Sequence, residues 1–328
     1  QSMWNEAIDQ YVKILKRYPN HCRAQEGLKK VRLMQKRAEI ESGYEFFEAD
    51  SSSRDSDVKK HTFFNKLNVP LNERLNLNVL YSLARRIFSD FKNTTENTSG
   101  IGFSYRNNPF WKVAGFFRHT EPYQTMHPVN EWGTWFGFRI FDFGESEVSY
   151  QRERLENNST VIRNAYYRDA YTTSVEIYAH RKISAGSGYA FYHYSDGNYM
   201  NEPNVFIMYY FSREPKLFSV KYTYFSRDFH KQMAAYFSPN NFSTHRLSIN
   251  WRHYLNKEEI FFGANDLYYD LRYDISVDSE DIVGHTFTAS LAWDINIRLR
   301  LKLEGQYAHS SADIYEDKRA TASMQYYF

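Results

Sequence analysis

The residue types best suited to catalysis or metal binding do not form a recognisable site in this sequence. Its 11 histidines are scattered, and the pairs His180 with His193 and His245 with His253 lack the i, i+4 or tetrahedral spacing that indicates zinc. No G-x-S-x-G nucleophile motif, phosphate-binding loop or dinucleotide-binding fingerprint is present. The sequence therefore predicts no metal, no cofactor and no enzymatic activity.

A Ser–His hydrolase remains an alternative, because such sites are defined by geometry and not by order in the chain. His309, Ser310 and Ser311 are one example of residues that a membrane-embedded hydrolase would use at its rim. The simpler interpretation of these three is that they are exposed loop residues.

A second chemistry is offered by charged side chains that alternate with apolar ones. The stretch IRLRLKLEGQ begins at Ile297, and its first eight residues alternate strictly. In a β-strand, successive side chains point to opposite faces, so one face is apolar and the other carries Arg298, Arg300, Lys302 and Glu304. A soluble sheet over a core and a transmembrane barrel around a watery lumen both accept such a strand.

Composition favours the barrel and excludes other classes. Aromatic residues make up 18% of the 328 residues, which suits the interfacial girdles of membrane barrels. The mean hydropathy is −0.68 and there is no run of 18 apolar residues, so a helical span is excluded. The formal net charge is only +2, which argues against nucleic acid as a partner, and the single Cys22 excludes an internal disulfide.

The first 37 residues have helical periodicity. Residues 3–17 and about 23–36 predict two amphipathic helices, separated by Pro19-Asn20. The spacing of Ala7, Tyr11 and Pro19 matches the A-x3-F…P end of a tetratricopeptide unit, and an unrelated helical hairpin is the alternative. Because such repeats stack only on their neighbours, we expect residues 1–37 to be the end of a longer periplasmic array.

From about Ile40 the period changes from 3.6 to 2 and stays there to the C-terminus. We predict about sixteen antiparallel strands in an all-β barrel spanning 38–328, with the strands near 39–50, 58–70, 72–87, 97–106, 110–119, 131–143, 145–155, 166–182, 186–196, 203–213, 215–227, 242–254, 257–272, 282–294, 296–309 and 317–328. Joins after even strands are short, whereas most joins after odd strands are long and polar, such as SRDFHKQMAAYFSPNN and YDISVDSEDI. This alternation is typical of an outer-membrane barrel with tight periplasmic turns.

The polar face of these strands supplies the candidate pore-lining residues. They are Glu41, Glu45, Arg74, Lys112, Arg118, Trp135, Glu147, Glu176, Lys221, Arg246, Arg252, Asp294, Arg298, Arg300, Lys302 and Glu304. Inward aromatic rings, including Phe116 and Trp135, are suited to stacking on sugar rings. The alternative for each residue is that it fills the lumen and pairs with its neighbour across the strands.

The arrangement resembles the exopolysaccharide export porins, the outer-membrane subunits of poly-N-acetylglucosamine and bacterial cellulose secretion systems. The resemblance covers the whole chain and is carried by the helical motif, by Tyr236-Phe237-Ser238-Pro239 and by the closing Tyr326-Tyr327-Phe328. It implies that the barrel lies in outer-membrane lipid and passes a nascent polysaccharide, and that the repeats bind periplasmic or inner-membrane synthase components.

The long loop that contains Tyr236, Phe237 and Pro239 is then the candidate gate of the outer mouth. Two other functions stay open. A general diffusion porin shares the barrel but gives no reason for a helical repeat, and an outer-membrane enzyme needs a nucleophile and a base at the rim.

Overall fold

The computed structural model describes residues 2–328 except 51–57, 73, 91, 108–109, 124–126, 141–142, 157–158, 214–215, 234, 256–266, 297 and 312–314. The helices are α1 (Ser2–Arg17), α2 (Cys22–Lys36) and α3 (Ser159–Arg163). The strands are β1 (Glu39–Asp50), β2 (Val58–Pro70), β3 (Leu75–Phe88), β4 (Thr94–Asn107), β5 (Trp111–Tyr123), β6 (Val129–Ile140), β7 (Gly144–Arg154), β8 (Tyr167–His180), β9 (Ile183–Tyr194), β10 (Tyr199–Ser212), β11 (Lys216–Phe229), β12 (Phe242–Tyr254), β13 (Leu267–Asp278), β14 (Val283–Asn296), β15 (Leu299–Ser310) and β16 (Glu316–Tyr327).

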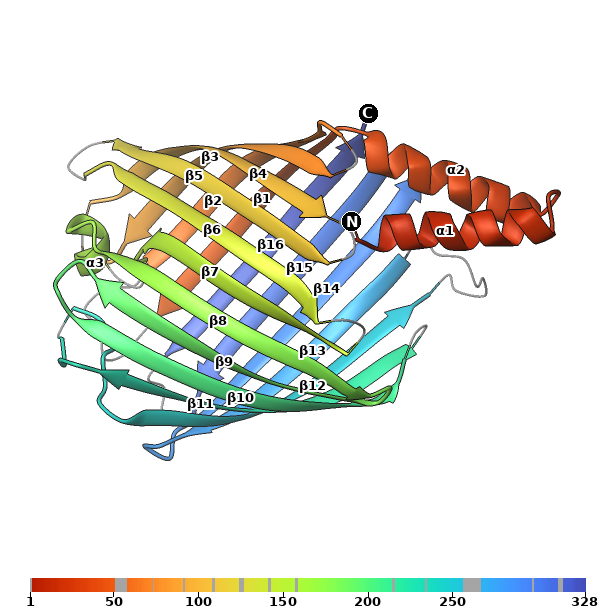
Figure 1. Ribbon diagram of the computed structural model, residues 1–328. Helices are drawn as coiled ribbons and strands as arrows, with labels where there is room; N and C mark the ends of the chain where they lie inside the picture. The colour runs from red at the N-terminus through yellow and green to blue at the C-terminus, as the bar shows by residue number, and fades with distance from the viewer. Residues whose placement is uncertain are drawn as a thin grey trace.

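The sixteen strands form one closed antiparallel barrel in which each strand pairs with its neighbours in sequence (Figure 1). β1 closes on β16 in a register that runs from Glu39 opposite Tyr327 to Asp50 opposite Glu316. Closure satisfies the backbone groups that a free edge would leave unpaired. The prediction of an antiparallel barrel of about sixteen strands is confirmed.

The two faces of the wall differ in chemistry as the alternation predicts. Along β3, Tyr81 and Leu83 are 52% and 41% exposed, whereas Arg86, in the opposite phase, is 1% exposed. A wall one strand thick can bury a side chain only toward its interior, so the phase of Arg86 is the inner face and the phase of Leu83 is the outer face. The register carries this assignment round the barrel, and the exposed apolar residues Ile207, Phe287 and Leu303 share the outer face.

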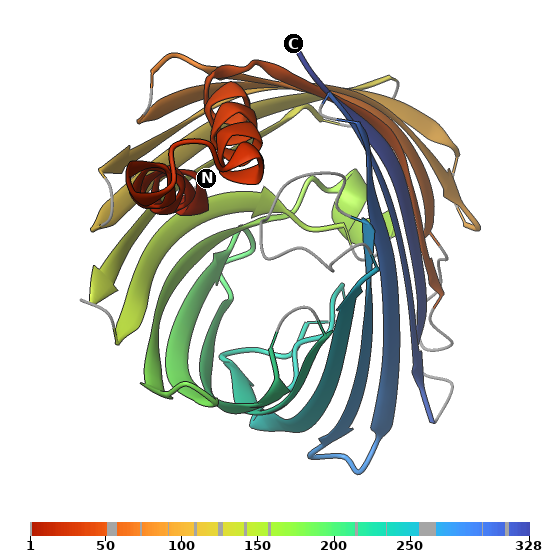
Figure 2. The same cartoon turned by 90° about the vertical axis from the view of Figure 1, so that its right-hand side faces the viewer.

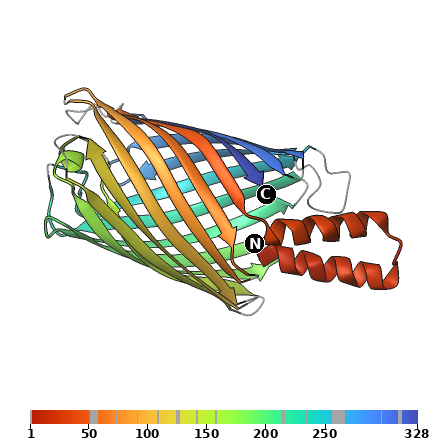
Figure 3. The same ribbon diagram turned by 90° about the horizontal axis from the view of Figure 1, so that it is seen from above.

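The two ends of the barrel also differ. α1 and α2 project from one end, here called the helical end, where both chain termini lie (Figure 3). The opposite end, here called the far end, carries α3 and the 230–241 loop. Turns at the helical end include the two-residue join between His180 and Ile183.

α1 and α2 form a hairpin with its own small core. Tyr11, Ala24 and Val31 are buried, and Ala7 and Leu15 pack against them. The absence of a side chain at Gly27 is required, because a Cβ there would lie 2.4 Å from Cζ of Tyr11. Among the described residues, no helix is both long and apolar enough to cross a membrane.

The thirteenth strand differs from its prediction. β13 runs over Leu267–Asp278 instead of 257–272, and residues 256–266 lie outside the described part of the chain. Most of the expected polar loop YDISVDSEDI is therefore strand, and the turn after it is tight. The carboxylate of Asp278 accepts hydrogen bonds from the backbone N–H groups of Glu280 (2.9 Å) and Ile282 (3.0 Å). These two hydrogen bonds form a tight turn where the polar sequence predicted a long loop.

Candidate functional site

The interior of the barrel collects most of the predicted pore-lining residues. The strand register places on the inner face Glu41, Glu45, Lys112, Arg118, Trp135, Glu147, Glu176, Lys221, Arg246, Arg252, Asp294, Arg300, Lys302 and Glu304. They come from strands on all sides of the barrel, so they line a wall and do not converge on one point.

Two predicted wall residues lie elsewhere, and this corrects their assignment. Arg74 and Arg298 are exposed residues of turns at the helical end. Each turn is fixed by an asparagine, because the Oδ1 atoms of Asn72 and Asn296 each accept a hydrogen bond of 2.8 Å from the backbone N–H two residues later. This side-chain turn ends the alternation before the arginine. Ile297, the first residue of the expected strand, lies outside the described residues.

The inner wall repeats one local arrangement, a cation lying over an aromatic ring. Lys112 Nζ lies 4.0 Å from the ring centre of Trp135, and Lys221 Nζ lies 3.9 Å from that of Phe206. Further pairs on the inner face are Arg118 with Phe116 (4.6 Å), Lys66 with Phe64 (4.5 Å), Arg319 with Phe47 (5.0 Å), Arg246 with Phe225 (5.3 Å) and Arg252 with Tyr268 (5.3 Å). Each contact contributes about 0.5–2 kcal/mol and holds a long side chain along the wall instead of across the lumen.

Glycines make room for this arrangement. A Cβ at Gly137 would lie 2.8 Å from Cε of Lys112, and one at Gly133 would lie 2.7 Å from Cε1 of Phe116. A cavity of about 550 Å³ lies along the same stretch of wall, and Arg118, Trp135 and Glu147 line it. The glycines therefore keep this part of the lumen hollow and let the cation–ring pairs lie flat.

Other wall charges are neutralised in place. Arg252 holds Asp270 with two hydrogen bonds, Nε to Oδ1 at 2.6 Å and Nη2 to Oδ2 at 3.0 Å. Arg300 holds the buried Asp294 in the same way, with Nη2 to Oδ2 at 3.3 Å. Arg252, Asp294 and Arg300 therefore pair with neighbouring side chains on the wall, as the alternative to a pore-lining role predicted.

The far mouth is crossed by an apolar cluster, here called the mouth core. It consists of Val58, Phe88, Leu155, Val161, Ile162, Tyr194, Met200, Phe229 and Tyr236. Its members come from β2–β3 on one side and β9–β11 on another, and the α3 segment joins them. Figure 2, which looks along the barrel from the helical end, shows α3 inside the outline of the strands.

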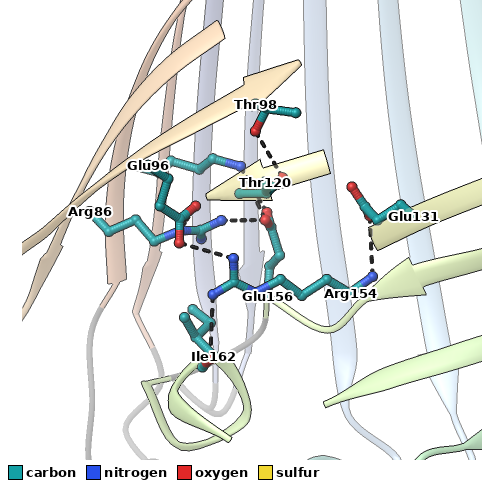
Figure 4. A network of polar contacts seen from close by, with 9 residues as sticks. Arg86, Glu96, Thr98, Thr120, Glu131, Arg154, Glu156 and Ile162 are labelled. Carbon is teal, nitrogen blue, oxygen red and sulfur yellow. Dashed lines mark hydrogen bonds and ion pairs between the residues drawn. The ribbon is translucent and has the colours of Figure 1, made fainter. Parts of the chain in front are cut away.

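A charge network, here called the mouth network, lies next to this core (Figure 4). Glu96 accepts a hydrogen bond of 2.9 Å from Nε of Arg86 and another of 2.9 Å from Nη1 of Arg154, and all three side chains are at most 3% exposed. Glu156 accepts from Arg86 and from Lys60, the latter at 2.9 Å. Arg154 Nη2 also donates to the carbonyl of Ile162 at 3.3 Å, which ties the network to α3.

The network holds Glu156 ionised. Burial alone would raise the pKa of its carboxyl group, but the positive charges of Arg86 and Lys60 outweigh burial and hold the pKa below its usual range. Glu156 precedes α3 in the loop, so an ionised Glu156 attaches this loop to the wall.

The predicted gate residues have three different environments. Tyr236 is buried in the mouth core, stacks on Tyr194 with ring centres 4.9 Å apart, and donates a hydrogen bond of 2.9 Å to Asp196. Phe237 is 44% exposed and meets Phe242 edge-on. The carbonyl of Pro239 accepts from the backbone N–H of Phe229. The described residues of this loop therefore contact the far mouth through Tyr236 and Pro239.

The structure does not bring together the three residues named as an example for the hydrolase alternative. His309 and Ser310 are consecutive in β15, so their side chains point to opposite faces, and His309 stacks on Tyr307 on the outside. Ser311 Oγ accepts a hydrogen bond from the backbone N–H of Val283. Among the described residues, no group of three or more His, Cys, Asp or Glu side chains lies close enough to hold a metal ion.

The mouth network and the mouth core are the features that sequence reasoning missed. Arg86 and Glu156 are 70 residues apart, and Arg154 and Glu96 are 58 apart, so no local spacing shows the network. One signal was present: Val161 and Ile162 are apolar neighbours in an otherwise polar loop, which indicates a loop that is packed and not solvated.

Comparisons with solved structures match the fold. A structure titled bacterial polysaccharide outer membrane secretin aligns with a TM-score of 0.69 and 12% sequence identity, covering 90% of this chain and 99% of that chain. OpdQ and OprD of Pseudomonas aeruginosa align with TM-scores of 0.46 and 0.44, at 10% and 8% identity, over 89% of this chain and 99% and 94% of theirs. No family model matches the sequence, and no curated protein does. The first likeness shows a shared barrel fold.

Proposed function

We propose that this chain is an outer-membrane channel with its helical end in the periplasm and its far end outside the cell. The outer face supports this, because it is an apolar belt bounded by aromatic rings. Trp111 contacts Phe136 on the outer face near the helical end, and Phe191 contacts Tyr199 near the far end. Such girdles mark the two membrane–water interfaces of a transmembrane barrel.

The cargo that we propose is an exopolysaccharide. The observation that carries this is the series of cation–ring pairs along the inner wall, from Lys112 on Trp135 to Lys221 on Phe206. A polymer that must slide needs many weak contacts along its path instead of one tight site, and aromatic faces with adjacent donors suit sugar rings and hydroxyls. The likeness to a structure titled as a polysaccharide secretin makes this cargo the first to test.

The helical hairpin is proposed to end a tetratricopeptide array that binds periplasmic or inner-membrane components of the polysaccharide synthase. The packing of Ala7, Tyr11 and Leu15 against α2 agrees with the helical motif in the sequence. The hairpin leaves the barrel at the helical end and projects away from the wall, so its surface is accessible to such a partner (Figure 3).

The 155–166 and 230–241 loops are proposed to gate the far mouth. The mouth core and the mouth network hold them closed, so export requires part of this contact set to open. A general diffusion porin would be expected to keep this mouth open without such a requirement.

The export proposal is tested by complementing a deletion strain with the full protein and measuring secreted glycan. Wild-type protein should restore secretion, and a variant with Trp135, Phe116 and Phe206 replaced by alanine should restore far less while still reaching the membrane. The control removes outer-face rings instead, with Phe103 and Phe117 replaced by leucine. A complemented strain that secretes no more glycan than the empty strain ends the export proposal and moves the porin forward.

A further inference from the structure

Most of the histidines, which are scattered along the chain, lie along one rim of the barrel. All 11 lie in the described part of the chain. Seven of them lie within four residues of the far end of a strand and share the outer-face phase: His61, His119, His193, His230, His245, His285 and His309. We call this set the histidine belt. It spans strands from β2 to β15, so it follows much of the rim.

The belt repeats a local arrangement with tyrosine. Nδ1 of His61, His230, His245 and His285 lies within 2.6–3.0 Å of a tyrosine hydroxyl, from Tyr44, Tyr199, Tyr222 and Tyr273 respectively. This contact uses one ring nitrogen and orients the imidazole, which leaves Nε2 outside the pair. One feature of tyrosine rings explains the location: their amphipathic character suits the boundary between lipid tails and headgroups.

The fixed charges that face the belt largely cancel. Asp169 is opposite His193 and is held by Arg152 through two 2.7 Å bonds, and Glu316 is opposite His309 and is held by Lys318 at 2.8 Å. Among the described residues, the other charged groups beside the belt are Arg85 opposite His61, Lys59 bound to Glu48 at 2.7 Å, Asp50 opposite Glu316, Glu121 two residues after His119, Asp228 two residues before His230 and Lys231 directly after His230.

Two histidines of the belt lie next to each other on neighbouring strands. His285 and His309 are directly opposite in the register of β14 and β15, on the outer face. Imidazoles change charge between pH 5 and 8, so protonation adds positive charge to a rim whose fixed charges are nearly balanced. Two adjacent protonated rings repel each other unless an anion lies between them, which favours an anionic occupant at this position.

We propose that the histidine belt binds the phosphate groups of lipids in the surrounding leaflet, and that it does so more strongly as the pH falls. The inference rests on the membrane placement proposed above and goes beyond the channel function. Each positive charge near an anionic lipid surface contributes about fivefold to lipid affinity. Several protonated imidazoles therefore give a selective layer of phosphate-bearing lipid around the far rim, whereas neutral imidazoles do not.

The experiment uses the full chain folded into phosphatidylcholine vesicles with or without phosphatidic acid, a lipid with a terminal phosphate. Lipids retained by the protein after mild extraction are counted by mass spectrometry at pH 5.5 and pH 8, and insertion is checked by heat-modifiable gel mobility. Wild-type protein should retain phosphatidic acid at least about tenfold more strongly at pH 5.5 than at pH 8, relative to phosphatidylcholine.

The test variant replaces His61, His245, His285 and His309 by asparagine, and it should lose most of that pH dependence. The matched control is His253→Asn, because His253 also meets a tyrosine hydroxyl on the outer face, Tyr269 at 3.2 Å, but at the helical end. The control should behave as wild type. Inserted protein that retains phosphatidic acid equally at both pH values, or a test variant that keeps the wild-type response, overturns this inference alone. A chain that inserts into neither kind of vesicle overturns the membrane placement as well.

Discussion

Replacing Glu96 by glutamine removes the charge that binds two buried guanidinium groups at the far mouth. Both hydrogen bonds, from Arg86 and from Arg154, are 2.9 Å long, and the side chains involved are at most 3% exposed. Removing one member of a buried ion pair costs about 3–5 kcal/mol. The glutamine oxygen still accepts one hydrogen bond, so we expect the lower value, about 3 kcal/mol, which is about a hundredfold more undocked loop.

The undocked loop is measured by limited trypsin digestion at the exposed Arg163 of α3 and by single-channel conductance in planar bilayers. Cleavage should be about a hundredfold faster in the Glu96→Gln variant, and open events should be more frequent. Heat-modifiable gel mobility establishes that the barrel itself is intact.

The matched control is Glu153→Gln, which removes the same charge from β7, the strand that carries Arg154. Glu153 contacts Arg168, but these side chains are 25% and 31% exposed, and partly exposed pairs contribute about 0–1 kcal/mol. We expect less than about a fivefold change in cleavage. If both variants are cut at the same rate, the mouth network does not hold the loop and the argument from burial is wrong.

Three further predictions concern pH, the outer face and the helical hairpin. The pKa of Glu156 in the closed loop lies below the ordinary value of 4.5, so the ionised carboxylate stabilises the closed loop fully at any pH above about 4.5. Channel conductance should therefore change only when the pH falls below about 4.5. Glu156→Gln should abolish this change, and a transition near pH 6 would point to another group. Leu303→Arg should cost about 2–4 kcal/mol of barrel stability in urea titrations, because Leu303 is 51% exposed on the apolar outer face at mid-strand. Glu304→Arg on the inner face should cost much less, and equal losses would show that the faces are misassigned. Gly27→Ala should loosen α1 from α2, because the new Cβ would lie 2.4 Å from Tyr11, and faster amide exchange in both helices would show this. The control Gly305→Ala should leave amide exchange unchanged, because no atom lies within 4 Å of the position of its Cβ.

The barrel was predictable because alternation is a local property of the sequence. In β15, the change of polarity at every residue from Leu299 to Glu304 is enough to fix the faces, and chain order then fixes the neighbours. The ends of strands were less predictable, since Asn72, Asp278 and Asn296 each make a turn through hydrogen bonds to one side chain, which hydrophobic periodicity does not register.

The site was only partly predictable for a different reason. The phase of a strand shows which side chains point inward, and it placed Lys112 and Trp135 on one wall, but it cannot show that they touch. The mouth network joins residues 58 and 70 apart, which only the folded barrel brings together. The histidine belt shows the same limit in another form. The spacing of His61 and His285 along the chain does not show that they belong to one set. Both lie near the far end of a strand and on the outer face, and these two properties place them in the same belt.

The seam between β1 and β16 has a consequence for how this protein is made. Ser323 donates a hydrogen bond of 2.8 Å to Glu41, a contact between residues 282 positions apart. This edge of β1 therefore has its partner only after nearly the whole barrel sequence has been made, and until the seam closes its backbone groups are unpaired. Contacts between such distant residues form slowly, and open edges with apolar surface aggregate. The chain thus depends on being kept apart from its own copies until β16 arrives, so a truncation that removes β16 should fail through aggregation before any loss of channel function can be measured.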